Sequence, residues 1–506
     1  MRVSAYFPTC LLGVLLNAPA ANASPTPSNG MVVKTTSGQI TGFINSTYPD
    51  VRQFLGIRYG KQATHQLRFS PPQRYTSNAP FNATKTPDAC PQFVSTLHNI
   101  INDAVTEYNN FAPISEDCLS LSVWAPKNIS KDDKVPVIIW IHGGGLQTGS
   151  SSVPLQQPPG WIQRSKSHIV VAVQYRLNIF GFPNAAGLKQ SNLGLMDQRM
   201  AIEWVRDNIE AFGGDLNKLV LWGQSSGAAS IDAQNFAFPG DPIVKGFIQD
   251  SGNVLIPPST GLATLDPMHR NFSFVAKELG CPPVPDAELA CMRSQSTERI
   301  VNFLANYTDT MATPPLNFIA TPDEKWVFSN YTDRYAKGLF SDRPAIFGSN
   351  LREGNIMVPF PKHPVHMGVN DTLSEMLTLA LFQCPAAHSA GMREAAKRKT
   401  YRYLYSGNFT DISPYFWAGA YHMTELPQIF GTRGDFIAAA SDYEVQTSEA
   451  MQDLWLGFAQ NLDAPEKAGW QEANGGKMLM LGVPGGPGVQ VIDEMVVDNP
   501  CKANGM

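Results

Sequence analysis

The sequence predicts an α/β fold built on a large, mainly parallel sheet. Two runs, residues 135–142 and 168–173, are almost entirely apolar, as expected of strands buried on both faces. A segment with helical periodicity follows over residues 195–212 and stops at Gly213. Apolar strands that alternate with helices are typical of a parallel sheet. The chain has 506 residues, of which 43% are hydrophobic, and no linker divides residues 24–506, so we expect a single domain.

Further strands are expected on both sides of this central part. Residues 31–60 alternate with turns, which predicts antiparallel strands at one edge of the sheet. Later short apolar runs predict strands at residues 218–222, 245–249, 345–350 and 400–405. Residues 257–340 carry more helix signals and loops. We expect them to form an insertion over the edge of the sheet where the strands end, which is where ligands bind in such folds.

One segment between two cysteines has apolar residues at helical spacing. These residues are Leu97, Ile100, Ile101, Ala104, Val105 and Tyr108, and they lie between Cys90 and Cys118. The spacing predicts an amphipathic helix. Two interpretations stay open: the helix is a lid over a pocket, or it is a surface helix that packs on the core.

The first residues are typical of a secretory signal. A positive charge at Arg2 precedes the apolar run at residues 11–16, and small residues lead to a cleavage site after Ala23. We therefore expect residues 1–23 to be removed and the protein to be secreted. No later segment is long and apolar enough to cross a bilayer. The net charge is -5 with no basic run, which argues against nucleic acid as a partner.

The cysteines and glycosylation sequons agree with export. Once Cys10 has left with the signal, six cysteines remain, an even number. Spacing favours Cys90–Cys118 and Cys281–Cys291 as local loops, which leaves Cys384 and Cys501 either as a long-range bridge or as free buried thiols. The predicted N-glycosylation sites are Asn45, Asn82, Asn128, Asn271, Asn306, Asn330, Asn370 and Asn408.

A candidate nucleophile lies at the end of the strand predicted at residues 218–222. The residues Gly223-Gln224-Ser225-Ser226-Gly227 match the pattern G-x-S-x-G, which places a serine on a sharp turn between a strand and a helix. A Cβ atom on either glycine would clash with the neighbouring strand and helix. The turn holds the hydroxyl of Ser225 above the sheet.

A serine nucleophile needs a general base, and in this fold the acid and then the histidine follow the serine along the chain. The histidines after Ser225 are His269, His363, His366, His388 and His422. His422 is favoured because it lies in a polar loop after a late strand. His363 and His366 flank a proline and lack a nearby third metal ligand, so we expect them at the surface and predict no metal site.

The acid that would orient the base is less well defined by spacing. Glu353 follows the strand predicted at residues 345–350 and precedes Gly354, which makes its loop tight. Asp250 and Asp342 are competitors, and Glu353 could instead pair with Arg352 in solvent.

A triple glycine predicts an oxyanion hole. His142-Gly143-Gly144-Gly145 comes directly after a buried strand, and residues without side chains let backbone N–H groups approach a substrate oxygen. Together with the N–H of Ser226 they would stabilise a tetrahedral intermediate, at about 3 kcal/mol per donor.

These motifs resemble the type-B carboxylesterase/lipase family, and the resemblance runs from Gly56 to about Phe458. The matching segments are residues 116–121, 142–145, 192–199, 204–205, 208–209, 212–215, 223–227, Glu353-Gly354, His422 and Trp455-x-x-Phe458. The resemblance implies an α/β-hydrolase fold, a triad of Ser225, Glu353 and His422, and oxyanion donors at Gly144, Gly145 and Ser226, with no cofactor. It also supports the pairs Cys90–Cys118 and Cys281–Cys291.

The sequence departs from the family's pattern at three places. Gln224 replaces the acid that usually precedes the nucleophile, and Leu146 replaces an aromatic residue after the triple glycine. Residues 91–117 contain no tryptophan, which argues against a choline site of the cholinesterase kind.

The sequence therefore predicts a secreted serine hydrolase that cleaves small-molecule carboxylic esters through an acyl-enzyme. A lid-gated triacylglycerol lipase or sterol esterase, and an enzyme of acyl transfer or lactone processing, remain alternatives. The aromatic residues 415–417 either line the pocket or belong to the core. The sequence leaves the physiological ester and the oligomeric state open.

Overall fold

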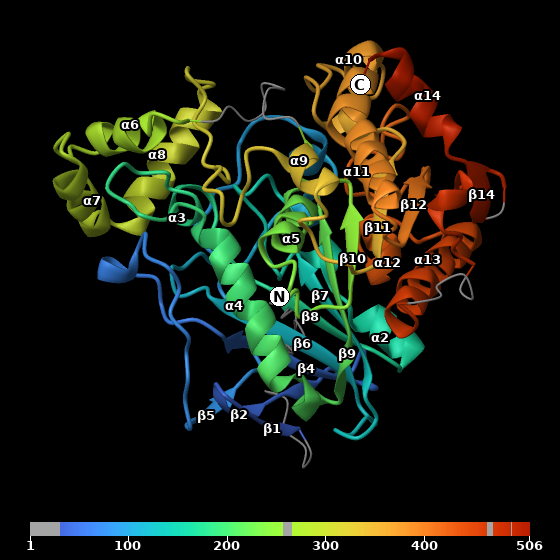
Figure 1. Cartoon of the computed structure of the whole chain (residues 1–506), viewed down its shortest axis with the longest axis horizontal. Coiled ribbons are helices and arrows are strands. Elements are labelled where there is room, and N and C mark those ends of the chain that lie inside the picture. The colour runs from blue at the N-terminus through green and yellow to red at the C-terminus, as the bar shows by residue number, and fades with distance from the viewer. Residues whose placement is uncertain (1–30, 257–265, 463–468, 487, 506) are drawn as a thin grey trace, which may run out of the picture.

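The computed structural model describes residues 31–256, 266–462, 469–486 and 488–505. The predicted signal, residues 1–23, lies outside the described residues. Within them, one sheet of 11 strands runs through the middle of the molecule, with helices on both faces (Figure 1). In spatial order its strands are β14 (Val489–Asp493), β13 (Lys477–Leu481), β12 (Thr400–Tyr405), β11 (Ala345–Asn350), β10 (Gly246–Asp250), β9 (Gly214–Gln224), β7 (Val135–Ile141), β8 (Ile169–Val173), β6 (Ser120–Pro126), β4 (Val51–Arg58) and β3 (Phe43–Ile44).

The centre of the sheet is parallel and its edges are antiparallel. Neighbouring strands run parallel from β13 across to β8. The pairs β14/β13, β8/β6, β6/β4 and β4/β3 are antiparallel. The prediction of a mainly parallel sheet with antiparallel strands near the N-terminus is thus confirmed, although β1 (Val32–Thr35) and β2 (Gly38–Thr41) form a separate small sheet with β5 (Pro80–Asn82).

Alternate side chains of β7 pack in two different cores, because successive residues of a strand point to opposite faces of the sheet. Val137, Ile139 and Ile141 pack in the core under α4 (Leu193–Asn208) and α5 (Ser226–Ala237). Ile138 and Trp140 pack in the core under α2 (Pro159–Ser165), α12 (Leu426–Phe430) and α13 (Asp442–Gln460). Burial on both faces explains why this strand is apolar over its whole length.

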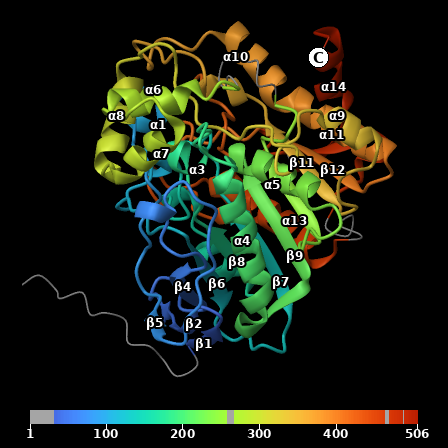
Figure 2. The same cartoon turned by 60° about the vertical axis from the view of Figure 1, so that its left-hand side comes forward.

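Over residues 266–340, the predicted insertion is confirmed as a helical region beside the ends of the parallel strands (Figures 1 and 2), and its residues 257–265 lie outside the described residues. Its helices are α6 (Arg270–Glu278), α7 (Pro285–Ser294), α8 (Thr297–Asp309) and α9 (Tyr331–Ala336). A second group follows β11: α10 (Asp371–Thr378), a π-helical turn at Leu379–Gln383, and α11 (Cys384–Ala395). The last helix is α14 (Met495–Ala503), and α3 (Asn178–Gly181) is a short helix after β8.

The single amphipathic helix predicted between Cys90 and Cys118 is wrong. The segment has only α1 (Ile100–Asp103) and a 3-10 turn at Thr106–Tyr108. Between them the backbone leaves the helical conformation, and Val105 and Tyr108 turn inward to pack with Leu155 and Ile412. Packing against distant residues thus overrides the helical spacing of the apolar side chains.

The six described cysteines form three disulfides: Cys90–Cys118, Cys281–Cys291 and Cys384–Cys501. The third bond joins α11 to α14 near the C-terminus. The sequon asparagines are exposed except for Asn271, which is half-buried and donates through Nδ2 to the carbonyl of Asn317. In the part of the chain that the structure describes, no helix has the length and apolar character needed to span a membrane.

Candidate active site

The turn after β9 has the geometry of a nucleophile elbow. Ser225 lies between β9 and α5 with φ 56° and ψ -128°, a strained conformation for a residue with a side chain. A Cβ on Gly223 would lie 2.6 Å from the carbonyl carbon of Gly227, and one on Gly227 would lie 2.2 Å from the oxygen of Ile141. The N–H of Ser225 donates to the carbonyl of Asp250 at 2.8 Å, which anchors the turn to β10.

The triple-glycine loop lies against this elbow. A Cβ on Gly143 would lie 2.9 Å from the Cβ of Ser225, so the close approach requires glycine. Gly144 has φ +107°, and a Cβ there would lie 2.2 Å from the oxygen of Thr148. The N–H of Leu146 donates to Oγ of Ser226 at 3.1 Å and ties the loop to the first residue of α5. The structure thus brings the triple-glycine loop against Ser225 and Ser226.

The predicted acid and base are in contact. Glu353 follows β11 in a short 3-10 turn, is fully buried, and its Oε2 lies 2.6 Å from Nδ1 of His422. The other carboxylate oxygen accepts the N–H of Asn350 at 2.6 Å, which fixes the side chain. A Cβ on Gly354 would lie 2.1 Å from the oxygen of Ser374, so the tight loop needs a glycine at this position.

His422 lies in the loop between β12 and α12 and is only 6% exposed. The ring of Phe382, from the π-helical turn, lies 4.7 Å from the ring of His422. On its other side, Nε2 of His422 lies 3.1 Å from Nε2 of Gln224, the residue before the candidate nucleophile. The imidazole is therefore enclosed by Glu353, Gln224 and Phe382.

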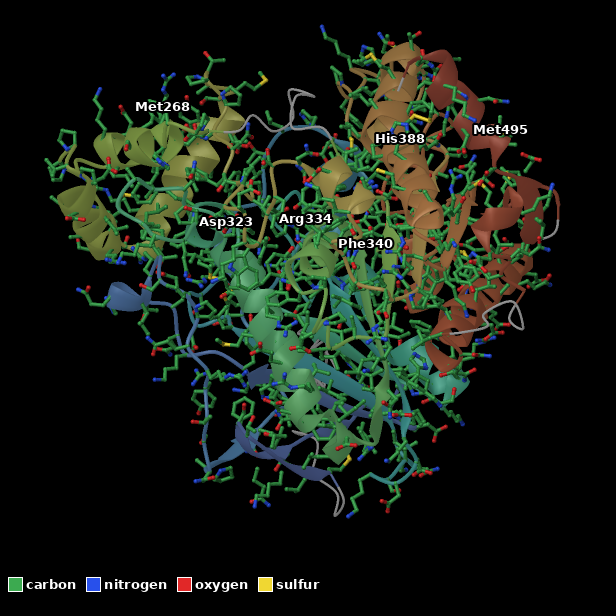
Figure 3. The ribbon with its side chains drawn as sticks, viewed as in Figure 1. Met268, Asp323, Arg334, Phe340, His388 and Met495 are labelled. Carbon is green, nitrogen blue, oxygen red and sulfur yellow. A yellow bond between two sulfur atoms is a disulfide. The ribbon has the colours of Figure 1, made fainter. Side chains whose placement is uncertain are left out.

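The competing bases and one competing acid, Asp342, lie away from this pair. Asp342 is exposed beside Arg343, and Arg352 pairs with Asp371 and leaves Glu353 to His422. His363, His366 and His388 are exposed, and Figure 3 shows His388 out on α11. His269 binds the carbonyl of Asn184. Among the described residues, no group of three or more histidine, cysteine or acidic side chains is arranged to hold a metal ion.

His142, which precedes the triple glycine, is buried and holds the loop in place. Its Nδ1 lies 2.9 Å from the carbonyl oxygen of Gly143, and its own carbonyl accepts the hydroxyl of Tyr175 at 2.7 Å. Burial lowers the pKa of His142 to about 4, so this imidazole stays neutral near pH 7. Its contacts are those of a support for the loop backbone.

Two further buried acids lie near the site, Asp250 and Glu425. Oδ2 of Asp250 accepts from Nε1 of Trp222 at 2.6 Å, and Glu425 accepts from the side chain of Asn350. Burial raises the pKa of Asp250 to about 7 and raises that of Glu425 well above its ordinary value. Both acids therefore keep their protons to a higher pH than ordinary carboxyl groups do, next to the Glu353–His422 pair.

Asp250→Asn is expected to make stability less dependent on pH. The folded protein holds a proton on Asp250 that the unfolded chain releases above about pH 4, so folding becomes less favourable as the pH rises towards the raised pKa of about 7. Asparagine keeps an acceptor for Trp222 and cannot ionise. The thermal midpoint of the variant should exceed that of the wild type by a few degrees at about pH 8 and match it at about pH 4.5. The same change at exposed Asp342 is the control, and equal midpoints of the Asp250 variant and wild type at both pH values would contradict the prediction.

A cavity of about 580 Å³ opens on Ser225. One wall is a face of α5 with Ser226, Ala229, Ser230 and Ala233. The other walls are Gly145–Gln147, Asn253, Val254 and Ile256, parts of residues 317–331, and Met357, Leu381 and Phe382. Among the described residues that line it, none carries a charge at neutral pH, so the cavity suits an uncharged, apolar group.

The insertion supplies the far wall of this cavity. The guanidinium of Arg334, on α9, lies 3.5 Å from the centre of the Phe328 ring, and Figure 3 shows Arg334 above α5. Neither the segment between Cys90 and Cys118 nor residues 415–417 contributes to the described lining. Trp417 is buried and Phe416 is exposed, so only part of the aromatic group at residues 415–417 belongs to the core.

The fold and the glycine-flanked turn after β9 are those of α/β-hydrolases. The chain belongs to the carboxylesterase family, whose model matches residues 29–368 and 361–485. It is 42% identical over 462 residues to a chlorogenic acid esterase of Aspergillus niger, covering 89% of this chain and 88% of that protein. It is 38% identical over 485 residues to secreted lipase 5 of Gibberella zeae, covering 89% and 90%. The acetylcholinesterase of Electrophorus electricus is 29% identical over 363 residues, covering 69% of this chain and 55% of that protein. The protein is thus a carboxylic-ester hydrolase.

Proposed function

We propose that the protein hydrolyses esters through Ser225, His422 and Glu353. Oγ of Ser225 attacks the ester carbonyl while Nε2 of His422 takes its proton and then gives it to the departing alcohol oxygen. Water attacks the resulting acyl-enzyme by the same route and regenerates the serine. Glu353 keeps the proton of the neutral imidazole on Nδ1 and stabilises the imidazolium. The 2.6 Å contact between Glu353 and His422 beside the elbow is the observation that carries this proposal.

The backbone N–H groups of Gly144, Gly145 and Ser226 are proposed to bind the oxyanion. The N–H groups of Gly144 and Gly145 belong to a loop that the hydrogen bond between Leu146 and Ser226 joins to the elbow. The N–H of Ser226 is that of the first residue of α5. N–H groups at the start of a helix are well placed for developing negative charge.

A fluorophosphonate probe tests the nucleophile directly. The probe should add once to the protein and abolish hydrolysis of p-nitrophenyl butyrate. Peptide mapping by mass spectrometry should find the adduct on Ser225. An adduct on another residue, or full activity of the labelled protein, would overturn the proposal.

The substrates are proposed to be neutral esters whose acyl part is apolar. The cavity at Ser225 has no charged lining among its described residues and includes the aromatic rings of Phe328, Tyr331 and Phe382. The relatives include both a chlorogenic acid esterase and a secreted lipase. A panel of p-nitrophenyl esters of increasing acyl length, together with chlorogenic acid and a triacylglycerol, separates an aromatic from an aliphatic preference.

Ala233→Phe is expected to shorten the acyl chain that the enzyme accepts. Ala229 and Ala233 line successive turns of α5, and Ala233 lies two turns from the elbow, so a large ring there would fill the cavity away from Ser225. We expect kcat/KM for octanoate and longer esters to fall about tenfold or more, with the acetate ester changed less than about twofold. Ala233→Gly is the matched variant that leaves the space open. An equal loss for all acyl lengths would contradict this placement of the acyl chain.

We propose that the protein is exported as one domain over residues 24–506 after removal of residues 1–23. The three disulfides and the relative named as a secreted lipase support this. The exposed sequons Asn45, Asn82, Asn128, Asn306, Asn330, Asn370 and Asn408 are proposed to carry glycans.

A further inference from the structure

The residue before the nucleophile touches the base. Gln224 is 3% exposed, and its Nε2 lies 3.1 Å from Nε2 of His422. In this orientation of the carboxamide, its nitrogen donates to Nε2 of the imidazole. The proton of the imidazole is then on Nδ1, which lies 2.6 Å from Glu353. This is the neutral tautomer that a general base needs before it can accept the serine proton.

The carboxamide of Gln224 is also held on its other side. Its backbone ends β9 and pairs with Asp250 of β10. A Cβ on Gly143 would lie 2.8 Å from Oε1 of Gln224, so the carboxamide oxygen lies against the backbone of the triple-glycine loop. Gln224 therefore fills the space between this loop and His422.

We propose that Gln224 is a positioning residue for ester hydrolysis: its carboxamide donates to Nε2 of His422 in the resting enzyme, keeps the imidazole neutral, and so extends activity to more acidic pH than a carboxylate at the same position allows. This inference rests on the proposed role of His422 as the base.

The carboxamide can serve both states of the base. In the resting enzyme it donates to the one lone pair of Nε2, which the hydroxyl of Ser225 takes over for the reaction. Once Nε2 carries the serine proton, a rotation of the carboxamide presents Oε1 as an acceptor. A carboxylate only accepts, so it would favour the protonated imidazole. A methionine of similar shape neither donates a hydrogen bond to the neutral imidazole nor offers a strong acceptor to the protonated one.

The titratable groups around His422 leave Glu353 as its carboxylate partner. Glu353 contacts Nδ1, Glu425 approaches from the loop before α12, and Asp250 lies at the end of β10. The phenols of Tyr403 and Tyr421, from β12 and the loop of the base, are buried with raised pKa values and stay neutral. His142, from the oxyanion loop, is neutral as well. A carboxylate at position 224 would lie across the imidazole from Glu353, and a proton on His422 would relieve the repulsion between the two.

The test compares the pH dependence of the wild type with that of Gln224→Met and Gln224→Glu. Because the neutral imidazole is the active form, any change that favours its protonation moves the acidic limb of kcat/KM to higher pH. We expect the midpoint pH of this acidic limb to increase in the order wild type, Gln224→Met, Gln224→Glu. For Gln224→Glu the increase should be about one pH unit. KM for p-nitrophenyl butyrate should change less than about threefold. The rate of fluorophosphonate labelling reports only folded protein. Its pH dependence should show the same acidic limb as kcat/KM for each variant.

Gln249→Glu is the matched control for a carboxylate buried at the end of a strand. Gln249 is a buried residue of β10 whose Nε2 donates to Asp232 at 3.2 Å. This variant should lose thermal stability and keep the wild-type limb. If both Gln224 variants keep the wild-type limb while Ser225 is labelled, the role of Gln224 is overturned and the triad stands. If the probe does not label Ser225 in the wild type, both proposals are overturned. Gln224→Met adds no charge, so it decides the question should Gln224→Glu fail to fold.

Discussion

Replacing Ser225 with alanine is expected to lower kcat/KM by about 10⁴-fold or more, because no other group then forms the acyl-enzyme. The fold should survive, since the strained backbone of Ser225 is fixed by the N–H bond to Asp250 and by the flanking glycines, not by the hydroxyl. Hydrolysis of p-nitrophenyl butyrate measures the loss of activity, and the thermal midpoint of unfolding shows whether the fold is kept.

Ser226→Ala is the matched control for Ser225→Ala. It removes the hydroxyl that accepts from Leu146 but keeps the backbone N–H at the start of α5. We expect a loss within about tenfold, through a looser oxyanion loop. If Ser225→Ala retained activity similar to that of Ser226→Ala, the assignment of the nucleophile would be wrong.

Glu353→Gln is expected to lower kcat by about 10³- to 10⁴-fold with little change in KM. The N–H of Asn350 needs an acceptor, so the new carboxamide should turn its oxygen to Asn350 and its nitrogen to His422. Nδ1 would then accept, and the proton of the imidazole would move to Nε2. That tautomer cannot take a proton from Ser225. Steady-state kinetics over the acyl panel measures the loss.

Glu425→Gln controls for the removal of a buried carboxylate near the base. Glu425 and Glu353 are both fully buried, and both accept a hydrogen bond from Asn350. Glu425 accepts from the side chain of Asn350, whereas Glu353 accepts from its backbone N–H and also contacts His422. We expect its replacement to change kcat less than about tenfold. Equal losses from the two substitutions would mean that the site needs buried charge in general and no particular partner for His422.

The centre of the fold could be predicted because its strands are buried on both faces. Residues 135–141 and 169–173 are apolar throughout, since cores lie above and below them. The prediction did not include β5, β6, β13 and β14. β13 begins with an exposed lysine, and β14 lies at the edge with exposed or half-buried side chains, so neither is apolar and buried throughout. The helix expected at residues 97–108 was wrong because Val105 and Tyr108 follow tertiary contacts.

The candidate site could be predicted where its chemistry depends on local sequence. The glycines around Ser225 and after His142 are required by close backbone approaches, so they leave a readable motif. The neighbours of His422 left no such signal. Phe382 comes from a π-helical turn and Glu425 meets Asn350 across 75 residues, so only the folded chain brings them together. The contact of Gln224 with the base was likewise hidden, although its departure from the family's acid marked the position.

The packing of the elbow restricts which positions a mutant library can vary. A Cβ on Gly252 would lie 2.2 Å from the carbonyl oxygen of Ser225, and a Cβ on Gly223 or Gly227 would also lie within 2.6 Å of a backbone atom. Randomising these glycines would mostly yield proteins that do not fold. Positions 224 and 226 carry side chains that face the base and the triple-glycine loop. A library selected for a new working pH or acyl preference can therefore vary two positions beside the nucleophile. Substitutions at these positions leave the path of the backbone unchanged.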